Sequence, residues 1–197
     1  MRPANKTYLQ VRHYTICTDA STSGGGGIVY DNTNGGLSTY GGKWQYKQSA
    51  TQIAELEALA LVNSWEQWKA TLGLSKRCLD HSRLRSDKPT HDADAYTATA
   101  AVHIRFMVDS SVLLWALTKR QSGNHLVWKY IRPILKDISR LNTLSNTTYS
   151  AAYVHTNLNP ADELSRARTL NPTKVHRSIV QNTEMGMTPE GITWLCG

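Results

Sequence analysis

The stretch AVHIRFMVDSSVLLWALTK, residues 101–119, combines the two periodicities on which the predicted fold depends. Its first part, 101–108, is an apolar run that predicts a buried β-strand, and the strand ends at Asp109. The following run, 112–119, has the apolar spacing of a helix. The local order is therefore strand, carboxylate, helix.

The chain before this stretch predicts a three-stranded antiparallel meander. Residues 8–18 are rich in β-branched and aromatic side chains. The polar, Gly-rich segment that begins at Asp19 predicts a turn before the apolar run 28–30. Turn residues at 31–36 separate that run from a third strand at 38–47.

Helices and strands alternate in the rest of the chain. Apolar spacing predicts helices over 53–68 and 125–141, and a strand over 149–155. A last helix is expected near Pro160, because proline is tolerated in the first turn of a helix. Strands that first meander and then alternate with helices indicate an α/β fold, in which a mixed five-stranded sheet carries helices on both faces.

The length of 197 residues suits one domain, which is predicted to span 8–168. Within it, 69–95 is rich in Lys and Arg and poor in apolar residues, and is interpreted as a basic insertion. The cations from Lys69 to Lys88 could face nucleic acid or could belong to a solvated loop. Residues 169–197 show no convincing period and are predicted to be an irregular tail or a linker.

The composition indicates an intracellular protein with polyanionic partners. Lys and Arg outnumber Asp and Glu by 22 to 15, a formal net charge of +7 that attracts phosphates. Three separated cysteines, with no Cys/His cluster, indicate neither a disulfide framework nor a structural zinc site. No signal peptide and no apolar run of roughly 18 residues is found. We therefore expect a soluble protein of the cytoplasm or nucleus, without a membrane partner.

Four carboxylates stand at the ends of predicted elements and are the candidate catalytic and metal-binding residues. Asp19 follows the first strand, Glu55 lies in the first turns of the first helix, and Asp109 follows the fourth strand. Asp162 lies near the start of the last helix. Hydrolysis of a phosphodiester by two metal ions needs several carboxylates at one place, because hard divalent cations prefer oxygen ligands.

The segments around these acids resemble the four motifs of ribonuclease H, in the same order. They read Thr-Asp-Ala-Ser at 18–21, Ala-Glu-Leu at 54–56, Val-Asp-Ser-Ser at 108–111 and Asn-Pro-Ala-Asp-Glu-Leu-Ser-Arg at 159–166. The last resembles the end of ribonuclease H domains attached to retroelement reverse transcriptases, of the Pao or the tyrosine-recombinase (DIRS-like) type. The gap from Glu55 to Asp109 is longer than the family pattern, as the insertion would explain.

The resemblance implies a ribonuclease H-like fold and an endonuclease that hydrolyses the RNA strand of RNA/DNA hybrids. It implies Mg²⁺ at Asp19, Glu55, Asp109 and Asp162, with Mn²⁺ as a possible substitute. The implied partners are the hybrid and an adjoining reverse transcriptase domain, and a monomer is expected.

Several residues carry an alternative interpretation. Glu57 is the rival of Glu55, because residues two apart on a helix point some 200° apart. His155 could assist proton transfer or metal release, or be a polar residue at a strand end. The glycines at 24–27 could end a hairpin or let backbone approach ribose hydroxyls. The tryptophans at predicted helical positions are expected in the core: Trp65, Trp68, Trp115 and Trp128.

Two other functions fit the same sequence. A transposase, integrase or exonuclease of this fold class would also cluster acids on such a sheet but would cut DNA. A degenerate module could keep the fold and bind nucleic acid without turnover. Retention of all four acids argues against the second, because a pure binder has no use for carboxylates where phosphate must lie.

Overall fold

The computed structural model describes residues 11–45, 52–72, 101–170, 172–184 and 194–196. Most of the predicted insertion lies outside these ranges. The described elements, in chain order, are β1 (Arg12–Ala20), β2 (Gly24–Asp31), β3 (Leu37–Lys43), α1 (Ile53–Thr71), β4 (Val102–Val108), α2 (Ser111–Lys119), α3 (His125–Ser145), β5 (Thr147–Tyr153), the 3-10 helix η4 (Thr156–Leu158), α4 (Asp162–Ser165), α5 (Pro172–Glu184) and β6 (Trp194–Cys196).

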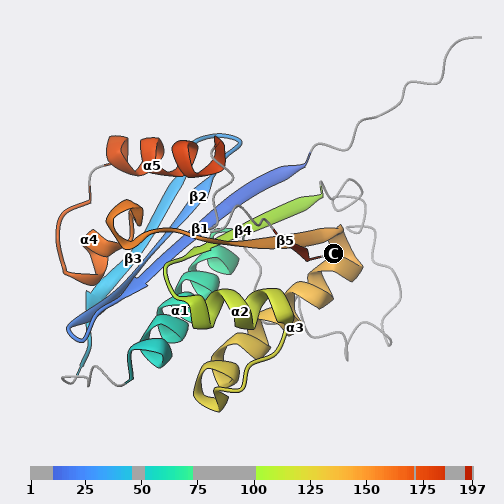
Figure 1. Ribbon diagram of the computed structural model, residues 1–197. Coiled ribbons are helices and arrows are strands. Elements are labelled where there is room, and N and C mark those ends of the chain that lie inside the picture. The colour runs from blue at the N-terminus through green and yellow to red at the C-terminus, as the bar shows by residue number, and fades with distance from the viewer. Residues whose placement is uncertain (1–10, 46–51, 73–100, 171, 185–193, 197) are drawn as a thin grey trace, which may run out of the picture.

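The strands form one mixed sheet in the order β3-β2-β1-β4-β5-β6 (Figure 1). β1 pairs antiparallel with β2 and parallel with β4, so it joins the meander to the parallel part of the sheet. β4 pairs parallel with β5. The five strands expected from the sequence are therefore present, and β6 adds a sixth, antiparallel to β5.

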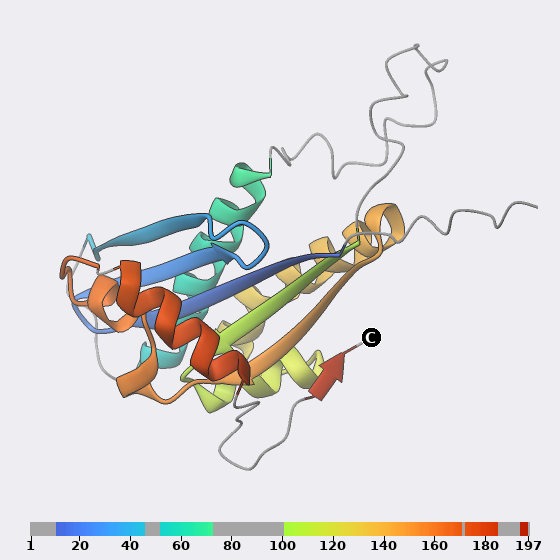
Figure 2. The same ribbon diagram turned by 90° about the horizontal axis from the view of Figure 1, so that it is seen from above.

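Helices cover both faces of the sheet, as the sequence predicted (Figures 1 and 2). On one face, α1, α2 and α3 cover the larger core, where Trp65 and Trp68 stack with ring centroids 4.7 Å apart. On the other face, α4 and α5 cover a smaller core that includes Cys17, Met107 and Val175. β1, β2 and β4 place side chains in both cores, because successive side chains of a strand point to opposite faces.

The chain after residue 168 differs from the predicted irregular tail. α5 spans Pro172–Glu184, and its Val175 and Ile179 are buried in the smaller core. β6 extends the sheet beyond β5. β6 is only three residues long, and α5 buries Val175 and Ile179 in the smaller core, so contacts with the rest of the domain stabilise both elements.

Two smaller expectations also need correction. Trp65 and Trp68 are core residues as predicted, but the Trp115 side chain is 59% exposed. Lys69, taken as the start of the basic insertion, lies in α1, where its Nζ is 2.7 Å from Glu66 Oε1 and 3.0 Å from Asp137 Oδ2. Within the described ranges, no helix is long and apolar enough to cross a membrane.

Candidate active site

Asp19 and Asp109 lie side by side at one edge of the sheet. β1 and β4 run parallel with Thr18 paired to Val108, so the next residue of each strand is an aspartate at the same level. Each carboxyl group affects the pKa of the other, and the two can share a hydrogen bond when one of them is protonated. The structure thus brings together the two acids that the sequence placed at the ends of different strands.

This pair has an unfavourable electrostatic environment. Burial is the largest influence on Asp19 and raises its pKa to about 7; the Ser165 hydroxyl lowers the pKa, and the charges of Asp109 and Asp162 raise it. Burial also raises the pKa of Asp109, with a further increase from the charge of Glu57. Two adjacent, poorly solvated carboxylates repel each other, so they need a shared proton or a cation between them.

Glu57 on α1 is the third carboxylate of this group. Burial raises the pKa of Glu57, a hydrogen bond with the Ser110 side chain lowers it, and the charge of Asp19 raises it. Its own charge acts on Asp109. Three acids from β1, α1 and β4 are therefore close enough to influence one another's ionisation.

The predicted ligand Glu55 lies elsewhere. The Tyr130 hydroxyl of α3 donates a hydrogen bond of 3.4 Å to Glu55 Oε1, so this side chain belongs to the contact between α1 and α3. The physical reason is helix phase, because residues two apart point in nearly opposite directions. Glu57 shares its face of α1 with buried residues 4, 7 and 11 positions later: Leu61, Ser64 and Trp68. Apolar residues lie on most sides of α1, so the sequence alone did not single out Glu57.

Asn159 connects the last motif to the ends of β1 and β4. Its Nδ2 donates a 2.8 Å hydrogen bond to the carbonyl oxygen of Thr18, and its side chain also hydrogen-bonds to Asp109. Its Oδ1 accepts a hydrogen bond of 3.1 Å from the backbone N–H of Ala161. Asn159 was not predicted as a site residue, although it stands in the motif at 159–166.

α4 carries Asp162 to the same edge of the sheet and adds two further contacts. The Ser165 hydroxyl donates to Asp19 Oδ2 and also to the Asp162 carbonyl oxygen, the latter at 3.0 Å. Arg166 Nε donates to Asp162 Oδ1 at 2.8 Å. Ser165 and Arg166 were also missed as site residues, and again their signal was their place in the motif.

The glycines at 24–27 lie in β2 and make room for the neighbouring elements. Gly26 is paired with Asp19, and a Cβ atom placed on it would lie 2.5 Å from Leu164 Cβ and 2.7 Å from the Ser165 nitrogen. A side chain at this position would therefore push α4 away from β1. The glycine permits the close approach through which Ser165 reaches Asp19, and an approach of these glycines to ribose stays a prediction.

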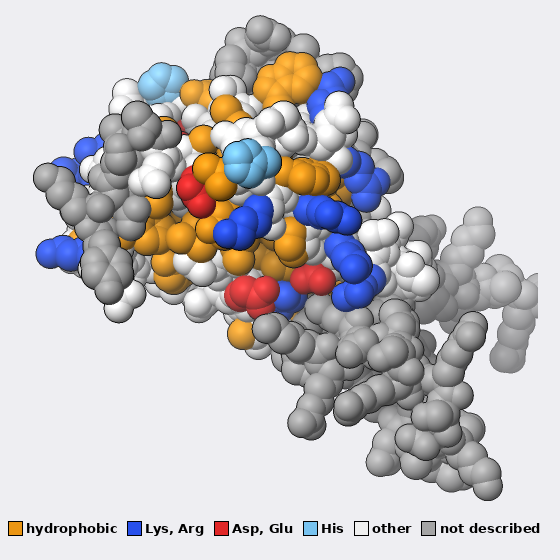
Figure 3. Space-filling model, turned by 90° about the horizontal axis from the view of Figure 1, so that it is seen from below, with side chains coloured by type: hydrophobic (Ala, Val, Ile, Leu, Met, Phe, Trp, Pro, Cys, Tyr) orange, Lys and Arg blue, Asp and Glu red, His pale blue; other side chains and the backbone are white. Residues whose placement is uncertain are grey.

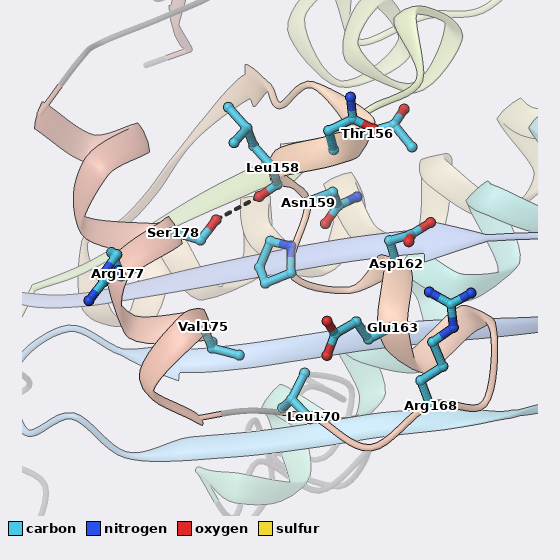
Figure 4. A pocket seen from close by; sticks show the side chains of 12 residues that line it. Thr156, Leu158, Asn159, Asp162, Glu163, Arg168, Leu170, Val175, Arg177 and Ser178 are labelled. Carbon is cyan, nitrogen blue, oxygen red and sulfur yellow. Dashed lines mark hydrogen bonds between the residues drawn. The ribbon is translucent and has the colours of Figure 1, made fainter.

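A cavity of about 240 Å³ opens beside Asp162, between η4, α4 and α5 (Figure 4). Asp162 and Arg168 lie at one end of it, and at the other end the Ser178 hydroxyl donates to the Leu158 carbonyl oxygen at 2.6 Å. His155 is exposed at the start of η4, where its Nδ1 accepts a 3.4 Å hydrogen bond from the Asn157 backbone. This contact is the N-cap of η4, and a part for His155 in catalysis stays a prediction.

The donor chemistry of the site fits a hard divalent cation, because its acids offer only oxygen ligands. In the described ranges, no three acidic, histidine or cysteine side chains are gathered tightly enough to hold one ion. The Ser165 hydroxyl donates a hydrogen bond to Asp19, and Arg166 donates one to Asp162. An ion bound between the two aspartates would relieve their repulsion, as a shared proton would.

Comparisons with known proteins found likeness in structure only. No protein-family model and no curated protein matches the sequence. The ribonuclease H1 of the halophilic archaeon Halobacterium salinarum NRC-1 is 16% identical, with a TM-score of 0.45 over 78% of this chain and 93% of that one. The N-terminal ribonuclease H domain of rv2228c from Mycobacterium tuberculosis is 13% identical, with a TM-score of 0.46 over 79% and 98%.

A third similar structure is LC11-RNase H1 in complex with RNA/DNA hybrid, 11% identical, with a TM-score of 0.46 over 80% of this chain and 95% of that one. The order and direction of β1 to β5, with helices on both faces, confirm the predicted fold class. The chemistry proposed for this chain rests on its own carboxylates and their neighbours.

Proposed function

We propose that this protein is a metal-dependent endonuclease that hydrolyses the RNA strand of RNA/DNA hybrids. The observation that carries the proposal is the meeting of Asp19, Glu57 and Asp109 at one sheet edge, with Asp162 close enough to act on Asp19. A cluster of half-buried carboxylates lowers stability unless a cation joins it, so a structural role does not account for it.

In this proposal the four acids hold two Mg²⁺ ions, for which Mn²⁺ is a possible substitute. When bound, such ions lower the pKa of an attacking water and stabilise the leaving 3′-oxygen. Asp19 and Asp109 are held by Ser165 and Asn159, which limits how far either carboxylate can turn. Arg166 reduces the charge that Asp162 adds to the group. The products would carry a 5′-phosphate and a 3′-hydroxyl.

The deciding experiment is a cleavage assay with hybrid labelled on the RNA strand. We expect cleavage with Mg²⁺ or Mn²⁺, none with chelator, and binding without turnover with Ca²⁺. Parallel reactions on duplex DNA test the alternative of a DNA-cutting enzyme of this fold, which would cleave DNA as well as hybrid. Binding of hybrid without turnover under any metal would instead support a catalytically inactive module.

The motif Asn-Pro-Ala-Asp at 159–162 further supports a role in retroelement reverse transcription, with a reverse transcriptase domain as neighbour. Such a role would take place in the cytoplasm or nucleus. Co-expression with the reverse transcriptase encoded nearest to this sequence, followed by copurification and a hybrid-cleavage assay, tests it. A cleavage rate unchanged by that domain, together with no copurification, would contradict the partnership.

A further inference from the structure

The solvent-facing side of α3 carries a line of four cations, which we call the basic face: Lys129, Arg132, Lys136 and Arg140. Their spacings of 3, 4 and 4 residues keep all four on one side of the helix. The first three are exposed and Arg140 is partly exposed. Figure 3 shows Lys and Arg side chains gathered on the side of the molecule that carries α1, α2 and α3.

The opposite side of α3 is fully occupied by the core. Val127, Ile131, Ile134 and Ile138 are all buried beneath it. The apolar side of this helix is therefore not available to a lipid bilayer, which an amphipathic helix enters through its apolar side. The basic face is therefore the side of α3 that is accessible to a partner.

Among the residues that the structure describes, no acidic side chain forms an ion pair with the basic face. α3 contains one acid, Asp137, whose carboxylate accepts hydrogen bonds from Lys69 and Trp65 of α1 at 3.0 and 3.1 Å. None of the ion pairs found among the described residues involves a cation of the basic face. The four positive charges are thus available to an external anion.

This arrangement lowers stability. Like charges three or four residues apart on a helix destabilise it, whereas Glu at one of these positions would stabilise it. The basic face contains three such consecutive pairs. A line of uncompensated cations therefore indicates a use that offsets this destabilisation.

The dimensions of the basic face match a nucleic-acid backbone. From Lys129 to Arg140 the helix rises about 16 Å, at about 1.5 Å per residue. A duplex carries one phosphate per about 3.4 Å of axis on each strand. About five phosphates of one strand thus lie within the length of the four cations.

We propose that the basic face of α3 binds the phosphate backbone of a nucleic-acid duplex, away from the reacting phosphate. This inference adds a contact with the rest of the duplex to the contact that the proposed function places at the scissile bond. It rests on the proposed function only in taking RNA/DNA hybrid as the duplex. Phosphate contacts of this kind position a duplex without reading its sequence. The contribution to binding is sequence-independent and is screened by salt.

The test is the salt dependence of hybrid binding, measured in chelator on the full chain carrying Asp109→Asn, so that nothing is cleaved. Changing all four cations of the basic face to Gln should reduce the steepness of the slope of log affinity against log salt concentration by about 3. Each phosphate that is no longer neutralised accounts for up to about 0.9 of this change. Binding at low salt should weaken roughly 10- to 100-fold. If the fourfold variant does not fold, the double variant Arg132→Gln/Lys136→Gln replaces it in the same measurement and should show a smaller effect in the same direction.

Two controls separate position from charge. Arg12→Gln/Arg177→Gln removes the same charge as the paired variant from exposed sites outside α3 and should leave the slope nearly unchanged. Exchanging Lys for Arg and Arg for Lys throughout the basic face should also retain binding. A slope equally reduced by the outside pair, or unchanged by the fourfold variant, overturns the proposal.

Two further outcomes identify the partner and separate the two proposals. Equal dependence of polyglutamate binding on the four cations would overturn nucleic acid as the ligand in favour of an acidic protein. If the wild-type chain cleaves hybrid but the fourfold variant keeps its slope, this inference fails and the proposed function stands. If the fourfold variant has a reduced slope but the wild-type chain never cleaves hybrid, the proposed function fails and this inference stands.

Discussion

Like charges gather in two regions of this molecule, the carboxylates at the ends of β1 and β4 and the cations along α3. Asp19 is buried, and burial raises the pKa values of Asp19 and Asp109. On α3 the cations face solvent, where water and salt screen their repulsion. The same kind of crowding is thus strongly destabilising at the sheet edge and only weakly so on the helix. We infer that the first region requires a shared proton or a bound cation and that the second only favours a polyanion.

The largest expected effect is on the buried group. Asp109→Asn should lower Mg²⁺-dependent cleavage of hybrid by about a thousandfold or more, because it removes one of two adjacent acids. The cleavage rate, with circular dichroism as a check of folding, measures this. Undiminished cleavage by the folded variant would sink the site assignment.

A second experiment compares the two glutamates of α1. Glu57→Gln should reduce cleavage roughly 100-fold, because it removes a charged oxygen donor beside Asp109. Glu55→Gln is the matched control and should change the rate less than about threefold, since it alters only a contact with Tyr130. A larger loss of cleavage rate in Glu55→Gln than in Glu57→Gln would instead indicate that Glu55 is the site residue.

The next effect concerns the packing that closes the acidic edge. Gly26→Ala should lower the free energy of unfolding by about 1–3 kcal/mol and also reduce activity, because the added methyl group meets Leu164 and moves α4. Gly42→Ala on the adjacent strand is the control, since a Cβ there meets nothing within 4 Å. Chemical denaturation measures both, and equal stability of the two variants would contradict the close approach.

The stability of the chelated protein should depend on pH through Asp19. Its folded-state pKa, about 7, lies above the ordinary 3.8, so the folded protein holds this proton more tightly than the unfolded chain does. The resulting stabilisation is complete below pH 3.8 and is lost as pH rises through about 7. It amounts to a few kcal/mol at most, and Mg²⁺ should restore it above neutral pH. Thermal unfolding across this range, with and without Mg²⁺, tests the expectation; Asp19→Asn should flatten the profile.

The smallest effect is expected on the exposed helix. Lys136→Glu should raise the free energy of unfolding by roughly 0.8–2 kcal/mol, because it replaces two like-charge pairs, with Arg132 and Arg140, by two attractive ones. Lys136→Gln should give about half of this gain, and high salt should reduce both. A loss of stability in low salt would show that the basic face is not under repulsion.

Sequence reasoning was most successful where one segment determines its own structure. The alternation along 101–108 predicted a strand that the structure shows as β4, and Asp109 follows it as expected. The helix over 53–68 was also predicted, but not which of its sides faces the sheet. Apolar residues surround α1, so its periodicity did not separate Glu57 from Glu55. The short α4 and the contacts of Asn159 and Ser165 depend on other segments and had no local signal beyond the motif.

The sequence by itself determined the strands β1 to β5, the three helices that cover one face, and the placing of Asp19 and Asp109 at strand ends. These follow from periodicity, which is a property of each segment alone. Only the tertiary structure decided that Glu57 joins the aspartates, that Gly26 admits α4, and that α5 and β6 complete the domain. These features depend on how closely distant segments approach one another, and a single segment's pattern does not contain that distance.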